Sequence, residues 1–450
     1  HRRMTVELGD GSVGLLPEEW LERWGLLAQV VGDKSKELKL SSRQVGLLDL
    51  VLTSLPVEGS DETLERLRER VDRFAHVEPA QPPESFHGEL RPYQEHGLGW
   101  LRAMAELGFG ACLADDMGLG KTVQVLAHLA QVHGKGAKPQ GPTLVVVPRS
   151  LVNNWLDEAR RFAPDLRVHV HWGAERTSPN EWPQADLVIT TYALLRLDLE
   201  ALAKREFECV VLDEAQAIKN ATSATAKAAK LLRGRQRLAL TGTPIENHLG
   251  ELWSLFDFLN PELLGELPVI KRLVAKAKPS VEGYELIRRV VRPFVLRRTK
   301  GEVARDLPER IEQTLYVELD DGERSAYDEL FAHYRARVAK QLTEQGPEQS
   351  TPHVLEALLR LRQAACHPGL IDEARRSENS SKVTALLEQL NNLREEGHKA
   401  LVFSQFTSLL GIVRSKLDEE GIRYEYLDGG TRDRAERVAR VQSDPDTPVF

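Results

Sequence analysis

The sequence predicts an α/β protein built on parallel sheets, in two parts separated by a mainly helical stretch. Continuous apolar runs alternate with helical stretches between about residues 111 and 240, and the alternation resumes near residue 380. Apolar strands that alternate with helices are typical of parallel sheets covered by helices on both faces. Polar residues follow directly after several of these strands, at the sheet edge where such folds bind their ligands.

Composition places the chain among ordinary globular proteins. Its 450 residues are enough for two or three domains, and 41% apolar and 28% charged residues are common values. The net charge of −8 argues against coating of nucleic acid by bulk charge, but it allows a local basic groove. No apolar run approaches the roughly 18 residues that span a bilayer, and no secretory leader opens the chain, so we expect no membrane partner.

The three cysteines are far apart in the sequence, at Cys112, Cys209 and Cys366. Two of them fall in predicted buried strands, so they are interpreted as small core residues in a reducing compartment. The dipeptide Cys366-His367 has no second pair nearby, which argues against a metal site. These features favour a cytoplasmic location.

Residues 1–87 contain no motif with an assignable chemistry. Helical patterns cover residues 18–31 and 64–74, and a cluster of prolines at 79, 82 and 83 indicates a domain boundary. We interpret residues 1–87 as a mainly helical N-terminal accessory region and as the candidate site for protein partners.

A helix is predicted to begin at Pro92, which suits a first helical turn. Gln94 lies in this helix, shortly before the glycine-containing loop that starts at Asp115. It is either an ordinary surface residue or a base reader, because a glutamine amide can both donate to and accept from the edge of adenine.

The stretch ACLADDMGLGKT predicts a phosphate-binding loop. A buried strand at 111–114 leads into the loop 115–120, and a helix begins with Lys121 and Thr122. Backbone N–H groups from Met117, Gly118, Leu119 and Gly120 would surround nucleotide phosphates, Lys121 would reach the β- and γ-phosphates, and the Thr122 hydroxyl would bind Mg²⁺. Asp115 departs from the common pattern, which has glycine at that position.

Further buried strands are predicted at 144–147, 167–171, 187–191, 209–212 and 237–240. Asp213 and Glu214 follow the strand at 209–212. They are either a solvated strand end or catalytic carboxylates. As catalytic residues, Asp213 would hold Mg²⁺ and Glu214 would activate water. Thr241, Gly242 and Thr243 follow another strand, where they form an ordinary turn or sense the γ-phosphate.

From Glu251 to about Arg376 the pattern is mostly helical, with a loop predicted at 346–352. Residues 292–310 are locally basic. We interpret this segment in one of three ways: it forms a solvated helix face, it contacts a phosphate backbone, or it braces the two lobes against each other.

Near residue 380 the alternation of helices and strands resumes. Helices are predicted at 382–393, 406–419 and 432–441, and strands at 399–403 and 422–427. Phe450 falls in what reads as a new strand. A parallel sheet of only two or three strands would leave an open apolar edge. We therefore expect the native protein to continue beyond Phe450.

With these pieces in order, residues 88–450 resemble the Swi/Snf branch of the superfamily 2 helicase-like ATPases, in its prokaryotic form. The resemblance is carried by LRPYQEHGLGWL, DDMGLGKT, LVVVPRSLVNNW, ITTY, LDEAQAIKN, LTGTPIEN, ELWSLFDFLNP, RPFVLRRTK, ALVFSQF and YEYLDGGTRDRAERV. It implies two RecA-like lobes with helical protrusions. The first lobe would cover 88–262, the protrusions and linker 263–376, and the first half of the second lobe 377–450.

The resemblance also implies roles for individual residues. Asp115 belongs in the phosphate loop of this family, Gln94 reads adenine, and Lys121, Asp213 and Glu214 are catalytic. Residues that couple the nucleotide to movement would be Gln216, Thr241, Gly242 and Thr243. Residues along the DNA path would be Arg149, Ser150, Asn153, Thr190 and Thr191 in the first lobe, and Ser404, Gln405 and Thr431 in the second.

The implied function is a DNA-stimulated ATPase, nucleoid-associated, that uses ATP and Mg²⁺ to move along double-stranded DNA and remodel what is bound there. The alternative is an ATP-gated DNA- or protein-binding subunit of a defence, repair or transcription-recycling complex. The last two family motifs, including an arginine that completes the site, would lie beyond Phe450. Because a missing arginine of this kind costs about 10³–10⁵ in rate, these 450 residues alone are expected to turn over ATP slowly.

Overall fold

The computed structural model describes residues 5–7, 13–15, 77–173, 175–242, 249–261, 263–264, 291–304, 311–431 and 433–450. The chain divides into two compact units, His1–Pro308 and Glu309–Phe450. Within residues 1–76, the described strands β1 (Thr5–Glu7) and β2 (Val13–Leu15) form an antiparallel pair. The helices predicted at 18–31 and 64–74 lie outside the described residues.

The first unit contains a seven-stranded sheet in the order β5-β6-β4-β7-β8-β3-β9, and every pairing within it is parallel. The strands are β3 (Ala111–Leu113), β4 (Thr143–Val147), β5 (Val168–Val170), β6 (Leu187–Thr191), β7 (Glu206–Leu212), β8 (Arg233–Leu240) and β9 (Val295–Leu296). The parallel α/β architecture of a RecA-like lobe is thereby confirmed, and because the pairs are parallel, the carboxyl ends of the strands meet at one edge.

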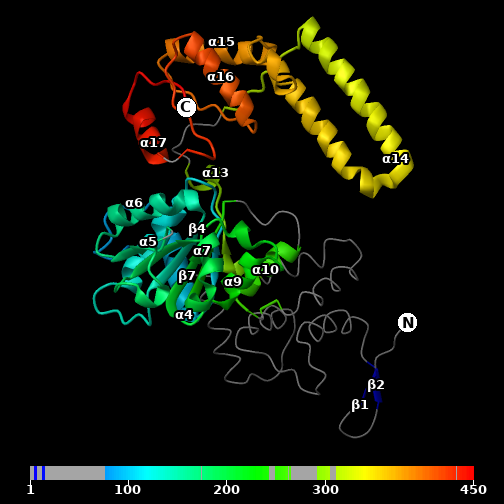
Figure 1. The fold of residues 1–450 in the computed structure, drawn as a ribbon. Coiled ribbons are helices and arrows are strands. Elements are labelled where there is room, and N and C mark those ends of the chain that lie inside the picture. The colour runs from blue at the N-terminus through cyan, green and yellow to red at the C-terminus, as the bar shows by residue number, and fades with distance from the viewer. Residues whose placement is uncertain are drawn as a thin grey trace. The chain divides into compact units, whose positions relative to one another are not determined.

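Helices cover both faces of this sheet (Figure 1). Along β4, Val145 and Val147 face one core, while Leu144 and Val146 face the other, as the two-residue repeat of a strand requires. The first core includes α4 (Pro92–Leu107), α5 (Lys121–Val132) and α6 (Val152–Phe162). The second includes α7 (Tyr192–Leu197), α8 (Leu199–Leu202) and α9 (Ala224–Leu231), and α10 (Leu249–Leu259) contributes to both. Short 3₁₀ turns lie at η1 (Arg149–Leu151), η2 (Pro179–Glu181) and η3 (Ala215–Ile218).

The segment RPFVLRRTK corrects part of the helical prediction for 251–376. After the turn η4 (Arg292–Phe294), the chain forms β9 and pairs in parallel with β3, with Val295 opposite Cys112 and Leu296 opposite Leu113. The β-branched and apolar side chains of Val295 and Leu296 suit this edge position. A short helix, α13 (Lys300–Val303), follows. The described part of the basic segment therefore contributes one short strand, Val295–Leu296, to the first sheet.

In the second unit, α14 (Asp321–Ala364) forms two long arms that meet near Gly346 (Figure 1). Gly346 has a φ of +79°, and this one residue reverses the chain. Arg337 and Glu356, one on each arm, approach to 3.9 Å. The predicted loop at 346–352 was therefore wrong, because a single glycine makes the turn and the following residues are helical.

The rest of the second unit matches the predicted start of another α/β arrangement in its helices, whereas the strands predicted at 399–403 and 422–427 are extended segments joined by isolated bridges. Ala400 and Tyr424 each form a parallel bridge with Val449, so three extended segments lie side by side with the segment at Val449 in the middle. The helices are α15 (Ser381–Glu395), α16 (Thr407–Glu419) and α17 (Arg434–Ser443), with short turns η5 (Pro368–Leu370) and η6 (Glu373–Arg375) before them. None of the helices that the structure describes combines the length and apolar character of a bilayer-spanning segment.

Candidate functional site

The loop between β3 and α5 reverses at two glycines. Gly118 and Gly120 have φ angles of 84° and 72°, in a region where other L residues are strained. A Cβ at Gly120 would also come within 2.5 Å of Gln94 Nε2. Directly after Gly120, α5 begins at Lys121, so its free N–H groups and positive dipole end face the loop. This is the geometry of an anion-binding loop, as predicted for Met117–Gly120.

Lys121 lies partly buried inside the loop, and Thr122 follows it on α5. The Lys121 ammonium donates to the carbonyl oxygens of Asp115 at 2.7 Å and Asp116 at 3.2 Å. Burial lowers the pKa of Lys121, and the neighbouring carboxylates, Asp115, Asp213, Glu214 and Asp116, oppose this effect. A partly buried ammonium on loop carbonyls can exchange those contacts for phosphate oxygens.

Asp213 and Glu214 follow β7 at the carboxyl edge of the sheet. Asp213 is only 8% exposed, and both of its oxygens accept hydrogen bonds: Oδ2 from Trp155 Nε1 at 2.7 Å and Oδ1 from the Glu214 N–H at 2.8 Å. Burial raises the pKa of Asp213, and these two bonds oppose the rise. The carboxylate is thus fixed in one orientation.

Glu214 has a φ of 50°, and among the described residues it is the one non-glycine with a positive φ. Such backbone strain costs on the order of 1 kcal/mol or more, and it concentrates at functional sites. The outlier therefore supports the interpretation of Asp213-Glu214 as more than a solvated strand end.

The residues predicted to couple the site lie beside these carboxylates. Gln216 Nε2 donates to Glu214 Oε2 at 2.6 Å, and the Thr241 hydroxyl donates to Gln216 Oε1 at 3.3 Å. Gly242 lies against the phosphate loop, since a Cβ there would come within 2.8 Å of Met117 Cγ and 3.7 Å of Lys121 Nζ. The sheet thus brings the end of β8 to both the loop and Glu214. Thr243 lies outside the described residues.

Gln94 is buried in α4, where it also contacts the phosphate loop. Its Nε2 donates to the Leu119 carbonyl at 3.1 Å, and its Oε1 accepts from the Arg91 N–H at 2.9 Å, which caps α4. The Tyr93 hydroxyl donates to the same Leu119 carbonyl at 3.2 Å. The predicted adenine reader is thus tied to the loop, and reading a base would require exchange of these contacts.

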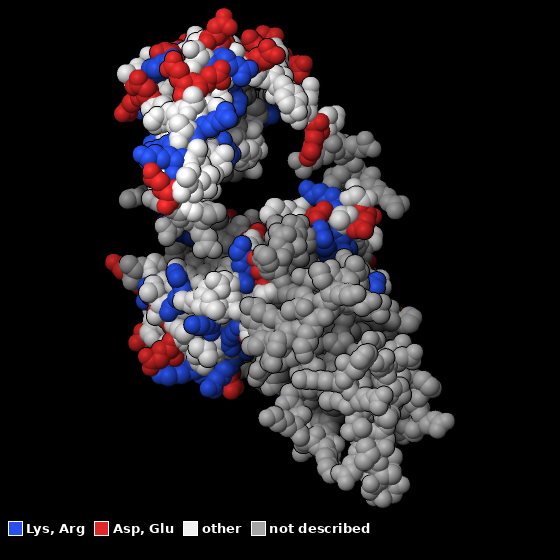
Figure 2. Space-filling model, turned by 90° about the vertical axis from the view of Figure 1, so that its right-hand side faces the viewer, with Lys and Arg blue, Asp and Glu red and all other residues white. Residues whose placement is uncertain are grey.

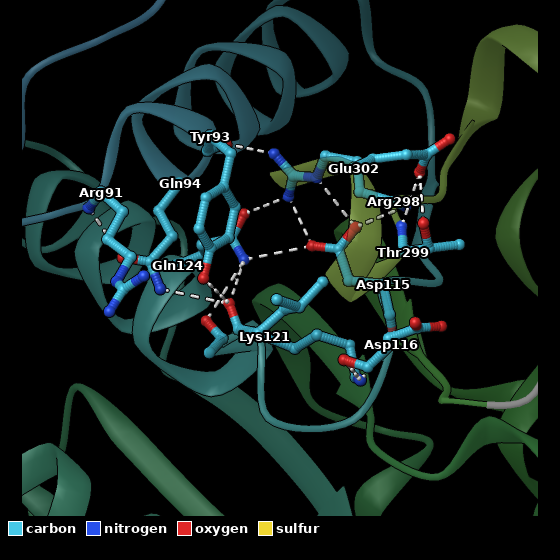
Figure 3. A network of polar contacts seen from close by, with 12 residues as sticks. Arg91, Tyr93, Gln94, Asp115, Asp116, Lys121, Gln124, Arg298, Thr299 and Glu302 are labelled. Atoms are coloured by element: carbon cyan, nitrogen blue, oxygen red, sulfur yellow. Dashed lines mark hydrogen bonds and ion pairs between the residues drawn. The ribbon is translucent and has the colours of Figure 1, made fainter. Parts of the chain in front are cut away.

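Sequence reasoning missed a buried network behind the loop (Figure 3). The Arg298 guanidinium, which follows β9, pairs with the Asp115 carboxylate and donates to Gln124 Oε1 at 2.7 Å and to the Tyr93 carbonyl. Asp116 joins it, because its N–H donates to the Arg298 carbonyl and its carboxylate accepts from the Lys300 N–H, both at 3.0 Å. The combined signal in the sequence was an acid at the usual glycine position and an arginine-rich motif with no assigned partner.

A metal ion would find only a few protein oxygens here. In the part of the chain that the structure describes, no group of three or more His, Cys, Asp or Glu side chains is arranged to hold a metal. Mg²⁺ in nucleotide sites uses one or two protein oxygens together with phosphates and water. The fixed Asp213 carboxylate and the Thr122 hydroxyl fit that partial ligand set. Cys112 and Cys209 are free thiols buried in the core, as predicted.

The predicted DNA contacts of the first unit lie at the same sheet edge. Arg149, Ser150 and Asn153 are exposed at η1 and the start of α6. The Arg149 guanidinium lies over the Trp172 ring, 5.8 Å from its centroid, a contact that sequence reasoning missed. Both residues line a surface pocket of about 270 Å³ that also includes Thr191.

The two threonines at the end of β6 have structural partners. Thr190 is fully buried, and its hydroxyl donates to the His171 carbonyl at 3.2 Å. Thr191 is nearly buried and caps α7 by accepting from the Leu194 N–H at 3.4 Å. The side chain of Thr190 is therefore not on the surface, whereas Thr191 reaches the pocket.

In the second unit, the predicted contacts occupy two turns. Gln405 is exposed and accepts from Arg362 Nη2 at 2.9 Å, and the Ser404 hydroxyl accepts from the Phe406 N–H at 3.0 Å. The Thr431 hydroxyl donates to Asp428 Oδ1 at 3.0 Å. Figure 2 shows that basic and acidic side chains are mixed on the described surface of the side that it draws.

Comparison with known proteins places these features in a family. The family model described as "SNF2-related domain" matches residues 93–370. The putative ATP-dependent helicase/translocase YwqA of Bacillus subtilis is 37% identical over 359 residues, which cover 77% of this chain and 38% of that protein. The human SWI/SNF-related matrix-associated actin-dependent regulator of chromatin subfamily A member 1 is 32% identical over 386 residues, or 81% of this chain and 36% of that protein.

Among solved structures, the chain is similar to the Sulfolobus solfataricus SWI2/SNF2 ATPase core in complex with dsDNA. The two are 33% identical with a TM-score of 0.48, and the match covers 83% of this chain and 79% of that one. The chain spans little more than a third of the length of the two relatives described above.

Proposed function

The chain belongs to the family of SNF2-related domains, and on this premise we propose that it is part of an ATP-driven motor that moves along double-stranded DNA and remodels what is bound there. The observation that carries the proposal is the assembly, at one sheet edge, of the phosphate loop, Asp213 with the strained Glu214, and the exposed turn at Arg149. The name of the bacterial relative, a helicase/translocase, supports movement along nucleic acid.

The proposed nucleotide chemistry follows from groups already fixed in place. The backbone N–H groups of Met117–Gly120 and the start of α5 would bind the phosphates, and Lys121 would move from the loop carbonyls to the β- and γ-phosphates. Gln94 would read the adenine edge. Bound Mg²⁺ would neutralise phosphate charge, with Asp213 and Thr122 as its protein ligands. Glu214 would orient the attacking water and accept its proton.

The coupling residues would transmit the state of the nucleotide. Gln216 touches both Glu214 and Thr241, and Gly242 lies beside Lys121 and Met117. A change at the γ-phosphate therefore has a short path of contacts to the end of β8. We propose that this path converts hydrolysis into movement along the duplex.

The proposed duplex contacts are Arg149, Ser150, Asn153 and Thr191 in the first unit, with Ser404, Gln405 and Thr431 in the second. They would mainly bind backbone phosphates, so binding should depend weakly on sequence and fall steeply with salt.

The test measures ATP hydrolysis with and without duplex DNA by the protein at its natural length. We expect duplex DNA to stimulate the wild-type protein and Lys121→Ala to abolish hydrolysis. Lys135→Ala, which changes an exposed lysine after α5, is the matched control and should retain the wild-type rate. Stimulated hydrolysis by Lys121→Ala would contradict the proposal. Displacement of a third strand from a DNA triplex would then distinguish movement from ATP-gated binding.

A further inference from the structure

Asp213 is bonded by two aromatic residues that approach it from opposite faces of the sheet. Trp155 on α6 is fully buried in the core that contains α4, α5 and α6, and its Nε1–H donates to Asp213 Oδ2 at 2.7 Å. Tyr192, the first residue of α7, packs against the other core, and its hydroxyl donates to the Asp213 backbone carbonyl at 2.7 Å. One bond orients the carboxylate and the other fixes the backbone that carries it.

Both aromatic residues belong to elements that begin at the proposed duplex contacts. Arg149 and Ser150 form the turn that leads into α6, and Trp155 is the fourth residue of that helix. Thr191 caps α7, and Tyr192 is its immediate neighbour. Each contact to DNA would therefore act on the end of a helix that holds Asp213.

A shared pocket connects the two contact regions. It has a volume of about 270 Å³, and Arg149, Thr191 and Tyr192 all line it. β4 and β6, which end in this pocket, are neighbours in the sheet, and β7, which Asp213 follows directly, lies on the other side of β4. A phosphate backbone against this edge would touch Arg149 and change the surroundings of the Tyr192 ring.

The connecting parts are too tightly packed to absorb such a change locally. Trp155 and the ends of β4 and β7 lie in the interior, where close-packed side chains move together rather than deform independently. Buried hydrogen-bonded networks are also rigid when every member is satisfied. A shift of α6 or α7 is therefore expected to reorient the Asp213 carboxylate.

We propose that Trp155 and Tyr192 are positioning residues through which contact with duplex DNA sets the orientation of Asp213 and so stimulates ATP hydrolysis. This inference rests on the proposed function, because it assigns the route of DNA stimulation within that site. Neither residue touches the nucleotide or the DNA in this scheme, and each acts through one hydrogen bond.

The experiment compares Trp155→Phe and Tyr192→Phe with the wild-type protein at its natural length. Each change removes one hydrogen-bond donor and keeps an aromatic ring. The matched control is Trp100→Phe, which removes a buried indole N–H that donates to the Pro293 carbonyl at 3.2 Å, away from Asp213. The readouts are the ratio of kcat with saturating duplex to kcat without it, the Kd for duplex, and the thermal midpoint of unfolding.

We expect both variants to bind duplex with the wild-type Kd, while the stimulation ratio falls about fivefold to tenfold. Trp100→Phe should keep the wild-type ratio. If the rates with and without DNA fall in parallel in both variants, the two bonds only support the fold and the inference is wrong. A fall of the same size in Trp100→Phe would overturn it as well. A wild-type protein that DNA does not stimulate would instead refute the proposed function, before any variant is measured.

Discussion

The Arg298 guanidinium forms an ion pair with the carboxylate of Asp115, the residue that stands where the common phosphate-loop pattern has glycine. Nε donates to Oδ1 at 2.9 Å and Nη2 donates to Oδ2, so the pair is bidentate. The Asp115 side chain is fully buried and the Arg298 side chain is 11% exposed. The acid at the glycine position is therefore explained by its partner, which comes from a motif 183 residues further along the chain.

Breaking this pair from one side should destabilise the first unit. Arg298→Met leaves the Asp115 carboxylate buried without its counter-ion, which costs about 3–5 kcal/mol. We expect the free energy of unfolding, measured by urea denaturation, to fall by that amount. ATP affinity should fall with it, because the backbone carbonyls of Asp115 and Asp116 hold Lys121.

A double variant distinguishes loss of the Asp115–Arg298 ion pair from unspecific destabilisation of the fold. Asp115→Asn combined with Arg298→Met should be more stable than the sum of the single losses predicts, because no unpaired charge remains. The control pair Glu200 and Lys204 is exposed on both sides, and its removal should leave the free energy of unfolding nearly unchanged. Additive losses at Asp115 and Arg298 would contradict the structure.

Gly120→Ala should weaken nucleotide binding for two separable reasons. An alanine at the φ of 72° is strained by roughly 1 kcal/mol. Its Cβ would also lie 2.5 Å from Gln94 Nε2, so the Gln94 amide would have to move. Gly136→Ala is the control, since Gly136 has a φ of 85° with no atom within 4 Å of an added Cβ. Both variants should lose similar stability, but only Gly120→Ala should raise the Kd for ATP, by about tenfold. Equal Kd values for both variants would contradict this role of Gly120.

His128 should make the first unit sensitive to acid. It is fully buried, and burial lowers its pKa from 6.5 to about 4. Between those values the unfolded chain binds a proton that the folded chain does not, so stability is lost as the pH falls through 6.5 and the loss is complete near 4. The expected contribution is about 3 kcal/mol. Urea denaturation at stepped pH should show a shallower acid loss in His128→Gln, which keeps a donor for Gln236; equal slopes would refute this.

The fold was largely predictable from the sequence because its main strands are continuous apolar runs. The runs at 144–147, 187–191 and 209–212 contain little else, and each lies within a strand of the sheet. β9 was missed because two apolar residues, Val295 and Leu296, carry no periodicity of their own. Their strand forms only because the edge of β3 is there to pair with, which is a long-range effect.

The site was predictable where neighbouring residues carry the chemistry, as in the phosphate loop and Asp213-Glu214. It was not predictable where the partners are distant in the sequence. Trp155 is the last residue of the motif LVVVPRSLVNNW, but its bond to Asp213 depends on how α6 packs on the sheet. The burial of the Thr190 side chain was not predictable either, because a hydroxyl at a strand end gives no sign of whether it faces the solvent or the core.

A comparison of Gln94 with Gln124 tests whether Gln94 recognises adenine or only supports the phosphate loop. Gln94 Nε2 donates to the Leu119 carbonyl at 3.1 Å, and Gln124 Nε2 donates to the same carbonyl at 3.4 Å and to that of Gly120 at 3.3 Å. A glutamine amide pairs with the N6 and N7 positions of adenine, whereas guanine presents two acceptors there. Gln94→Met should therefore raise KM for ATP about tenfold and bring the ATP and GTP values together, as steady-state hydrolysis of each nucleotide would show. Gln124→Met, the matched variant, should weaken both nucleotides equally. If Gln94→Met also weakens them equally, Gln94 supports the loop and does not read the base.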